Sequence, residues 1–373
     1  MRKGFIFNQR LLMMNKTKEI LIIGAGPSGL SMAIFLSELG YSPKIIDKKK
    51  SISKRSKALG VNPRTLELFE PLGITEKFLS NGRRMNAINI WKGDKHIVRN
   101  DFQKAKHKYP FMLIQPQKES EEILLNEVQQ RKIKVEYNTE FTSIKTNENQ
   151  DKAVLQGTAQ EYEIPYDFLI GADGGQSKVR ELSGVQYEGL RYDEEWELYD
   201  IELEMELNRD EGHIRFFPEG GVLMIRLQDN IWRVAGRMKS ILNYLPPKSK
   251  TGKILWESKF RIHHKIAKKL AWKNIGIIGD AAHLHSPVGA RGMNLGIEDA
   301  FVLSNLIDNN SLNMFDEVRK PYIKQTVNGI NNLTMVLAGD SRRSKFFRNN
   351  IGILKFLAPL IIPRARKFML GIN

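Results

Sequence analysis

Residues 19–29 read Glu-Ile-Leu-Ile-Ile-Gly-Ala-Gly-Pro-Ser-Gly, and this stretch decides the fold. The apolar run that ends at Ile23 predicts a buried strand, and the glycines directly after it predict a tight turn. Apolar residues then recur at helical spacing over residues 30–39, and Gly40 is suited to end the helix. A second strand is predicted over residues 44–47. A strand, turn, helix and strand in this order are typical of the start of a parallel α/β sheet.

The glycines of this turn have the spacing of a dinucleotide-binding motif. Gly24 permits the tight turn, Gly26 lets the backbone approach a pyrophosphate, and Gly29 lets the helix pack closely on the strand. Free N–H groups at the start of the helix can then bind the phosphates. Asp47 ends the next strand, where a carboxylate accepts hydrogen bonds from ribose hydroxyls and repels a 2′-phosphate. The pattern therefore favours FAD or NAD over NADP as the bound dinucleotide.

A second glycine turn follows a predicted strand over residues 168–170. It belongs to residues 167–180, Asp-Phe-Leu-Ile-Gly-Ala-Asp-Gly-Gly-Gln-Ser-Lys-Val-Arg, and it carries Asp173. Ser177 is suited to cap the turn or helix that follows. Because α/β sheets hold ligands at the ends of their strands, Asp173 is a candidate binding residue. A purely structural Asx turn is the alternative.

The third segment, residues 276–300, reads Gly-Ile-Ile-Gly-Asp-Ala-Ala-His-Leu-His-Ser-Pro-Val-Gly-Ala-Arg-Gly-Met-Asn-Leu-Gly-Ile-Glu-Asp-Ala. A strand ends near Asp280, a loop contains Pro287, and a helix is predicted from about Met293. Free N–H groups at such a helix start stabilise negative charge, which in a reduced flavin lies at N1 and O2. The two histidines of the loop lack a third ligand at metal-binding spacing, so we expect capping or packing roles and no metal site.

The pattern of the chain changes between residues 182 and 270, where short alternating stretches separated by turn signals indicate hairpins. We therefore predict an α/β fold in which an antiparallel β-sheet domain interrupts a Rossmann-type domain. The Rossmann-type domain is expected over residues 19–84, 112–181 and 271–335, and the inserted sheet over residues 85–111 and 182–270. A C-terminal helical segment is expected over residues 336–373, and a disordered leader over residues 1–18.

The composition restricts the class of protein. The chain has 373 residues, no cysteine and a formal net charge of +16. The absence of cysteine excludes disulfides, thiolate metal sites and Fe–S clusters and fits a cytoplasmic location. The basic residues are scattered and no nucleic-acid-binding motif accompanies them, so we expect no nucleic acid partner. We favour the interpretation that the positive charge only forms a solvated basic surface. The functional alternative is that its electrostatic field attracts anionic cofactors.

The C-terminal residues 341–370 are apolar and basic and contain no acidic residue. We expect this segment to form a terminal helix that packs on the rest of the protein, and contact with a membrane surface is the alternative. No apolar run in the chain is long enough to span a membrane. The sequence leaves open whether the protein is a monomer or a homodimer.

Together, the three glycine-rich segments resemble the group A flavoprotein monooxygenases, the p-hydroxybenzoate hydroxylase-like family. Two shorter stretches agree: Lys57–Glu67 resembles the segment before the family's second helix, and Leu113–Glu119 resembles its glutamine-bearing strand end. The similarity runs from about residue 19 to 335. It implies that the Rossmann-type domain binds FAD and that the inserted sheet is the substrate domain.

The resemblance also implies where the cofactor lies. Asp47 and Arg55 should lie at its adenosine end, and Gln115 and Asp280 along its ribityl and pyrophosphate portions. Residues 292–294 should meet the isoalloxazine edge. The full set of implied cofactor-binding residues is Gly24, Gly26, Pro27, Ser28, Gly29, Asp47, Lys48, Arg55, Gln115, Asp173, Asp280, Pro287, Gly292, Met293 and Asn294.

Two positions depart from the family's pattern. Lys57 stands where arginine is common, and a lysine cannot make the same bidentate phosphate contact. Residues 289–292 read Gly-Ala-Arg-Gly where Gly-Gly-Gln-Gly is common. Arg291 either stabilises a reduced or peroxidised flavin, binds an acidic substrate, or points to solvent. Pro287, in the same loop, should lie close to the ring where oxygen reacts.

The implied activity is hydroxylation of an aromatic or polyketide-like small molecule, with antibiotics among the candidates. NAD(P)H would reduce the FAD, O2 would add to form a C4a-hydroperoxide, and oxygen would pass to a substrate over the inserted sheet. The sequence identifies no catalytic base. His213, Arg215 and Arg226 are candidates only by their place in the sheet, where core or rim roles are favoured. A geranylgeranyl reductase-like flavin reductase and a non-catalytic flavin-binding protein are the alternatives.

Overall fold

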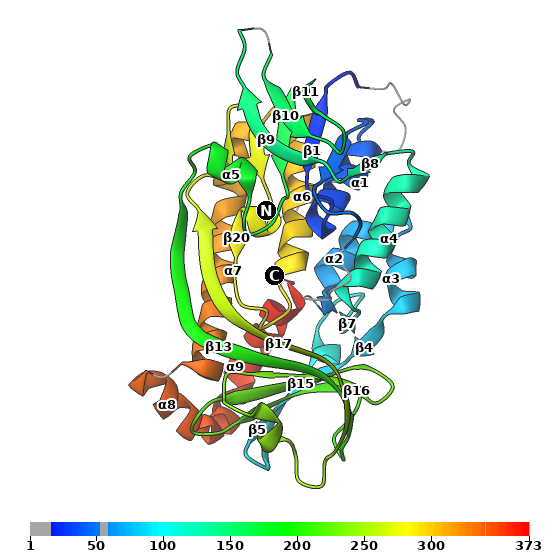
Figure 1. Cartoon of the computed structure of the whole chain (residues 1–373). Coiled ribbons are helices and arrows are strands. Elements are labelled where there is room, and N and C mark those ends of the chain that lie inside the picture. The colour runs from blue at the N-terminus through cyan, green and yellow to red at the C-terminus, as the bar shows by residue number, and fades with distance from the viewer. Residues whose placement is uncertain (1–15, 53–58, 149, 340, 373) are drawn as a thin grey trace.

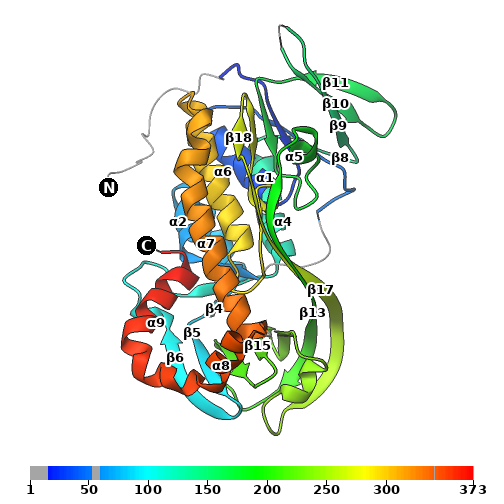
Figure 2. The same ribbon diagram turned by 90° about the vertical axis from the view of Figure 1, so that its left-hand side faces the viewer.

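The computed structural model describes residues 16–52, 59–148, 150–339 and 341–372. An α/β unit forms one end of the molecule, a large β-sheet forms the other, and two long strands run between them (Figure 1). The C-terminal helices pack beside the large sheet (Figure 2). The predicted fold class, an α/β unit with an inserted sheet and a C-terminal helical segment, is confirmed.

Parallel strands form the centre of the α/β unit, in the order β8-β2-β1-β12-β19, and β18 pairs antiparallel at the edge. They are short, and those in the middle are apolar and buried, as in sheets with both faces covered. The bounds are β1 Ile20–Ile23, β2 Lys44–Asp47, β8 Val135–Tyr137, β12 Phe168–Gly171, β18 Ala271–Trp272 and β19 Ile275–Ile277.

Two smaller sheets accompany the central one. The first is antiparallel, with β9 Glu140–Lys145, β10 Lys152–Gln156 and β11 Glu161–Pro165. The second contains β3 Gly60–Val61, β4 Arg83–Met85 and β7 Met112–Ile114. The helices are α1 Pro27–Glu38, α2 Pro63–Phe69, α3 Thr75–Asn81, α4 Gln117–Gln130, α5 Lys178–Leu182, α6 Gly292–Asp308, α7 Phe315–Ala338, α8 Arg342–Asn349 and α9 Leu354–Leu370.

The helices begin and end where the sequence carries the corresponding signals. Pro27 occupies the first position of α1, and Gly40 follows its end with a φ of 87°. Asn62 caps α2 through its side chain, and Ser177 caps α5 in the same way. These local signals are the reason that the α/β unit could be predicted from the sequence.

The large sheet has eight strands in the order β20-β17-β13-β16-β15-β14-β5-β6. Its bounds are β5 Ala87–Lys92, β6 Lys95–Asp101, β13 Tyr187–Glu204, β14 Glu211–Phe216, β15 Gly221–Gln228, β16 Ile231–Gly236, β17 Lys250–Ala267 and β20 His283–Leu284. The prediction of a wholly antiparallel sheet is wrong at one pair, because β5 pairs parallel with β14. No tight turn connects these two strands, so nothing local forces them to run in opposite directions.

The ends of the large sheet lie against the α/β unit and the C-terminal helices. β13 and β17 begin their pairing at Tyr187 and Ala267, and the Ala267 N–H donates to the carbonyl oxygen of Ala282 at 2.8 Å. α7 extends from the α/β unit to the sheet, and α9 packs on β6 (Figure 2). Within the described ranges, no helix has the length and apolar character needed to cross a membrane.

Candidate functional site

The turn between β1 and α1 is packed on one side and open on the other. Gly24 has a φ of 108°, and a Cβ there would lie 2.4 Å from the carbonyl oxygen of Ala172. A Cβ at Gly29 would lie 1.9 Å from the carbonyl oxygen of Gly24, so only glycine lets α1 begin this close to β1. A Cβ at Gly26, in contrast, would meet nothing within 4 Å. The open position leaves the backbone accessible to a ligand.

The N-terminus of α1 opens at the same place. Gly26 is its N-cap, no side chain caps the helix, and its first turn contains no acidic residue. Uncapped N–H groups at the positive end of a helix dipole attract anions. Pro27 and Ser28 are half-buried in this first turn. The arrangement can hold a pyrophosphate.

Asp47, at the end of β2, is bound to this turn. Its Oδ2 accepts from the Ala25 N–H at 2.8 Å, and its Oδ1 accepts from the Lys49 N–H at 2.8 Å. Each carboxylate oxygen has a further lone pair, so the group can also accept from a ribose hydroxyl. Lys48 instead is exposed and lies 4.0 Å from the carboxylate of Glu140, also exposed.

The first and third glycine-rich segments meet where α1 crosses α6. Cβ atoms at Gly279 and Gly296 would lie 2.4 and 2.2 Å from the Ser28 hydroxyl oxygen, so both glycines permit this close crossing. The second segment joins them through the close approach of Gly24 to Ala172. All three segments singled out in the sequence therefore converge at the N-terminus of α1.

Asp173, in the second segment, binds the start of α5. Its Oδ2 accepts from the amides of Lys178 and Val179, at 2.7 and 3.2 Å. Burial raises the pKa of this carboxyl above its usual value. The structural role considered from the sequence is therefore present, and a role toward a ligand stays a prediction.

Arg180 connects the second segment to the third, and the sequence did not predict this role of Arg180. Its guanidinium donates to the carbonyl oxygens of Gly175 and Ala281, both at 2.8 Å. The same group lies 3.9 Å from the centre of the Tyr187 ring, and the Tyr187 hydroxyl donates to the carbonyl oxygen of Asp280 at 2.9 Å. Arg180 and Tyr187 thus position the Asp280 loop through contacts that no local sequence signal could reveal.

The side chain of Asn294, a residue expected at the flavin edge, forms hydrogen bonds with backbone groups of the protein. Its Oδ1 accepts from the Asn62 N–H at 2.9 Å, and its Nδ2 donates to the carbonyl oxygens of Gly60 and Ala290, at 2.8 and 2.6 Å. These bonds join α2 and β3 to the start of α6. No side chain caps α6, whose N-cap is Arg291, so a ligand there would meet backbone N–H groups.

Gln115 follows β7 and is completely buried. Its Oε1 accepts from the Ser120 hydroxyl at 3.0 Å, whereas its Nε2 has no hydrogen-bond partner among the described residues. A buried donor without a partner is costly, and a ligand oxygen would satisfy it. This observation fits the predicted place of Gln115 beside a polar part of a cofactor.

Arg291 is buried, so the alternative that it points to solvent is wrong. It donates to the Tyr322 hydroxyl at 2.9 Å and lies 3.7 Å from the carboxylate of Glu298. A Cβ at Gly371 would lie 2.1 Å from its Nη1, which shows that the residue after α9 covers the guanidinium. Its Nε and Nη1 have no hydrogen-bond partner in the part of the chain that the structure describes.

His283 and His285 both bond within the protein, as the packing interpretation predicted. The Nε2 of His283 lies 2.5 Å from the Asp299 carboxylate, and the Nδ1 of His285 lies 2.8 Å from the Ser286 carbonyl oxygen. Burial lowers the pKa of His285 to about 3. Among the described residues, no group of three or more histidine, aspartate or glutamate side chains is placed to hold a metal ion.

The remaining implied residues of the third segment are exposed or half-buried, and Arg55 cannot be placed. Asp280 and Pro287 are exposed, and Met293 is half-buried. Arg55 and Lys57 lie outside the described residues.

The candidates in the large sheet are engaged within it, which favours the core and rim roles. His213 bonds a backbone carbonyl, Arg215 forms an ion pair with Asp94, and Arg226 lies 2.9 Å from Asp210. Burial lowers the pKa of both His213 and Arg215.

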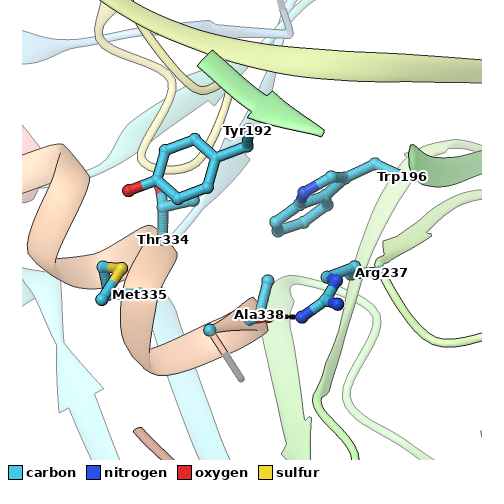
Figure 3. A pocket seen from close by; sticks show the side chains of 7 residues that line it. Tyr192, Trp196, Arg237, Thr334, Met335 and Ala338 are labelled. Carbon is cyan, nitrogen blue, oxygen red and sulfur yellow. Dashed lines mark hydrogen bonds between the residues drawn. The ribbon is translucent and has the colours of Figure 1, made fainter. Parts of the chain in front are cut away.

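A cavity of about 80 Å³ lies between α7 and strand β13 of the large sheet. Figure 3 shows Tyr192, Thr334 and Met335 on the left and Trp196 and Arg237 on the right. Arg237 lies at the edge and donates to the carbonyl oxygen of Ala338. The remaining lining residue is Gly339. The lining is mostly apolar and aromatic.

Residues 17–238 and 232–309 match the family model described as FAD binding domain. The chain is 30% identical over 308 residues to pentachlorophenol 4-monooxygenase of Sphingobium chlorophenolicum, covering 76% of this chain and 57% of that protein. It is 28% identical over 305 residues to 6-methylpretetramide 4-monooxygenase of Streptomyces rimosus, covering 77% and 55%.

The chain thus spans little more than half the length of these curated relatives. Among solved structures, p-nitrophenol 4-monooxygenase from Pseudomonas putida superposes with a TM-score of 0.81 at 17% identity, covering 95% of this chain and 99% of that one. At this identity the likeness shows a shared fold.

Proposed function

Because the chain belongs to the FAD binding domain family, we propose that it is an FAD-dependent monooxygenase that hydroxylates an aromatic or polyketide-like small molecule. The family match and the aromatic monooxygenases among the curated relatives confirm the resemblance to the group A flavoprotein monooxygenases. One observation carries the proposal: the three glycine-rich segments converge at the open, uncapped N-terminus of α1.

The residues at this turn fit the parts of FAD. We infer that the α1 N–H groups beside Gly26 bind the pyrophosphate and that Asp47 binds the adenosine ribose. The unpartnered Nε2 of Gln115 would donate to the cofactor between its two ends. Backbone N–H groups at the start of α6 would stabilise negative charge on the ring system. When bound, FAD supplies the oxidation–reduction chemistry, with NAD(P)H as electron donor and O2 as oxidant.

The large sheet and α7 would then hold the substrate. The cavity lined by Tyr192 and Trp196 offers aromatic side chains for contact with such a guest. Its volume of about 80 Å³ is below the roughly 300 Å³ of a typical ligand pocket, so a polyketide-like guest would need a wider opening between the sheet and α7. The protein's task would be to orient that guest and exclude water, because no protein nucleophile is needed for the reaction. The cytoplasmic location and the choice between monomer and homodimer stay predictions.

The first experiment measures the cofactor. We expect the purified chain to show the absorbance spectrum of bound flavin, or to take up FAD with quenching of flavin fluorescence. NADH or NADPH oxidation is then followed with a panel of phenols and polycyclic aromatic compounds, and ¹⁸O2 is used to trace the inserted atom by mass spectrometry.

The outcomes separate the candidate functions. A hydroxylated product that carries ¹⁸O supports the proposal, and an absence of FAD uptake would overturn every flavin function. FAD binding without NAD(P)H oxidation on any compound would favour the non-catalytic alternative. Reduction of a prenyl double bond without O2 would favour the reductase.

A further inference from the structure

The outer face of the C-terminal helices exposes an unusual concentration of large apolar side chains. Of the 13 such residues exposed on the described chain, seven lie in residues 346–361. Phe356 is 82% exposed, Phe346 69% and Leu360 65%. The seven, called here the C-terminal apolar face, are Phe346, Phe347, Ile353, Phe356, Leu357, Leu360 and Ile361.

The opposite side of α9 is already used by the fold. Leu354, Ile362 and Leu370 are buried. The Phe368 ring packs directly on Gly329 of α7, where an added Cβ would lie only 2.6 Å from the ring. Figure 2 shows α9 against the large sheet with its other side turned outward. A helix that is apolar on both sides is normally buried on both sides, so the outer side lacks a partner here.

The apolar face contains a groove between α8 and α9. It has a volume of about 150 Å³ and is lined almost wholly by apolar side chains, among them Phe347, Ile351 and Leu357. A groove of this kind can receive an acyl chain or an apolar side chain.

Exposed basic residues lie in the same two helices as the apolar face. Residues 341–372 contain no aspartate or glutamate. The exposed cationic residues are Arg342, Arg343, Lys345, Lys355, Arg364 and Lys367. If two copies joined through this face, cations would meet cations with no acid between them. The face therefore fits an occupant that is both apolar and anionic.

We propose that α8 and α9 dock this protein on the surface of an anionic phospholipid bilayer. The C-terminal apolar face enters the boundary between headgroups and acyl chains, and the exposed bases of these helices bind lipid phosphates. The contact is peripheral. It is independent of the proposed chemistry, so its test uses no enzymatic activity.

The test is cosedimentation of the full chain with vesicles. Vesicles of equal parts phosphatidylglycerol and phosphatidylcholine should bind the protein, and vesicles of phosphatidylcholine alone should bind it much more weakly. High salt should weaken binding to the anionic vesicles, because the bases contribute through screened charge.

Two variants separate the apolar and the charged contributions. The double variant Phe356→Ser/Leu360→Ser should lower vesicle partition by roughly tenfold or more, because both side chains lose their burial in lipid. Lys355→Glu/Arg364→Glu should remove the preference for anionic vesicles. Leu190→Ser is the matched control, since this β13 leucine is 60% exposed but lies outside the face. Far-UV circular dichroism and thermal denaturation check that each variant is folded.

Three results would overturn the proposal. The first is wild-type protein that does not bind anionic vesicles. The second is binding that Phe356→Ser/Leu360→Ser leaves unchanged, which would place the contact elsewhere on the chain. The third is a concentration-dependent dimer in analytical ultracentrifugation that this variant abolishes, without vesicle binding, because the face would then belong to a second copy.

Discussion

Gly26 and Gly29 are the same residue type, but their surroundings differ. A Cβ at Gly29 would overlap the Gly24 carbonyl, whereas a Cβ at Gly26 would meet no protein atom within 4 Å. The φ and ψ of Gly26, −81° and −177°, are extended values that alanine adopts easily. Gly29 is thus required for the close packing of the turn, whereas Gly26 leaves space for a ligand.

Gly26→Ala should therefore leave folding intact and weaken FAD binding. We expect an unchanged melting temperature of the apoprotein and an FAD affinity lower by about tenfold or more, because the methyl group occupies the place of the pyrophosphate. Gly29→Ala should instead cost more than about 2 kcal/mol of the free energy of unfolding. Flavin fluorescence titration and thermal denaturation measure the two effects. Normal FAD binding by Gly26→Ala would contradict the placement of the cofactor.

Two buried histidines should make the protein sensitive to acid. Burial lowers the pKa of His264 to about 4 and that of His285 to about 3, from an ordinary value of 6.5. Below pH 6.5 these histidines bind protons in the unfolded chain but not in the folded chain. The free energy of unfolding should therefore be unaffected by them above pH 6.5. It should fall as the pH drops, down to about 4 for His264 and about 3 for His285. The slope should approach about 1.4 kcal/mol per pH unit for each histidine.

Urea denaturation between pH 7 and 4 tests this dependence. His264→Phe keeps a ring against Tyr192, whose ring centre lies 5.5 Å away, and should reduce the acid sensitivity. The same substitution at the exposed His96 is the control. An unchanged pH slope in His264→Phe would show that other groups dominate.

At the scale of elements, α6 and α7 are joined by a buried ionic cluster centred on Asp299. Its carboxylate lies 2.6 Å from Arg319 of α7 and 2.5 Å from His283, and it also accepts from the Gly279 N–H at 3.2 Å. Burial alone would raise the pKa of Asp299, but the neighbouring His283 and Arg319 outweigh burial and hold the pKa of this carboxyl below its usual value. One carboxylate thus connects both helices to the loop that carries Asp280.

Asp299→Asn should therefore destabilise the protein strongly. We expect a loss of about 3–5 kcal/mol in the free energy of unfolding, because buried Arg319 would lose the compensating charge. Glu317→Gln on α7 removes the same charge at an exposed position and should have little effect. Chemical denaturation compares the two. Equal stability of both variants would mean that the cluster does not join the helices energetically.

At the scale of the whole molecule, two 18-residue strands connect the α/β unit to the large sheet. β13 and β17 pair from Tyr187↔Ala267 beside the third glycine-rich segment to Glu204↔Lys250 at the far end of the sheet, with three register shifts between these ends. Unfolding of the α/β unit or of the large sheet would therefore disrupt β13 and β17, which are part of the packing of both.

We therefore expect the two units to unfold together. In urea, far-UV circular dichroism and tryptophan fluorescence, to which the buried Trp196 and Trp232 contribute, should give coincident transitions. FAD at a hundredfold excess over its Kd should shift the common transition by about 2.7 kcal/mol. Two separate transitions, of which only one responds to FAD, would contradict this coupling.

The sequence by itself determined the positions of the three glycine-rich segments and the strands and helices that flank them. The signals for these features are local: the apolar run before Gly24, the proline at the start of α1, and the caps Asn62 and Ser177 each act within a few residues. For the same reason, Asp47 could be named as a candidate site residue from its place at the end of β2. Gln115 was named only because residues 113–119 resemble a segment of the family.

Only the tertiary structure decided how these pieces meet. The parallel pairing of β5 with β14, the burial of Arg291 beneath Gly371, and the contacts of Arg180 all join residues far apart in the chain. Such contacts depend on which surfaces the folded chain brings together, and no local pattern encodes them. The close approaches at Ser28 and at Gly24 are the clearest examples, because the first joins the third glycine-rich segment to α1 and the second joins the Asp173 segment to the same turn.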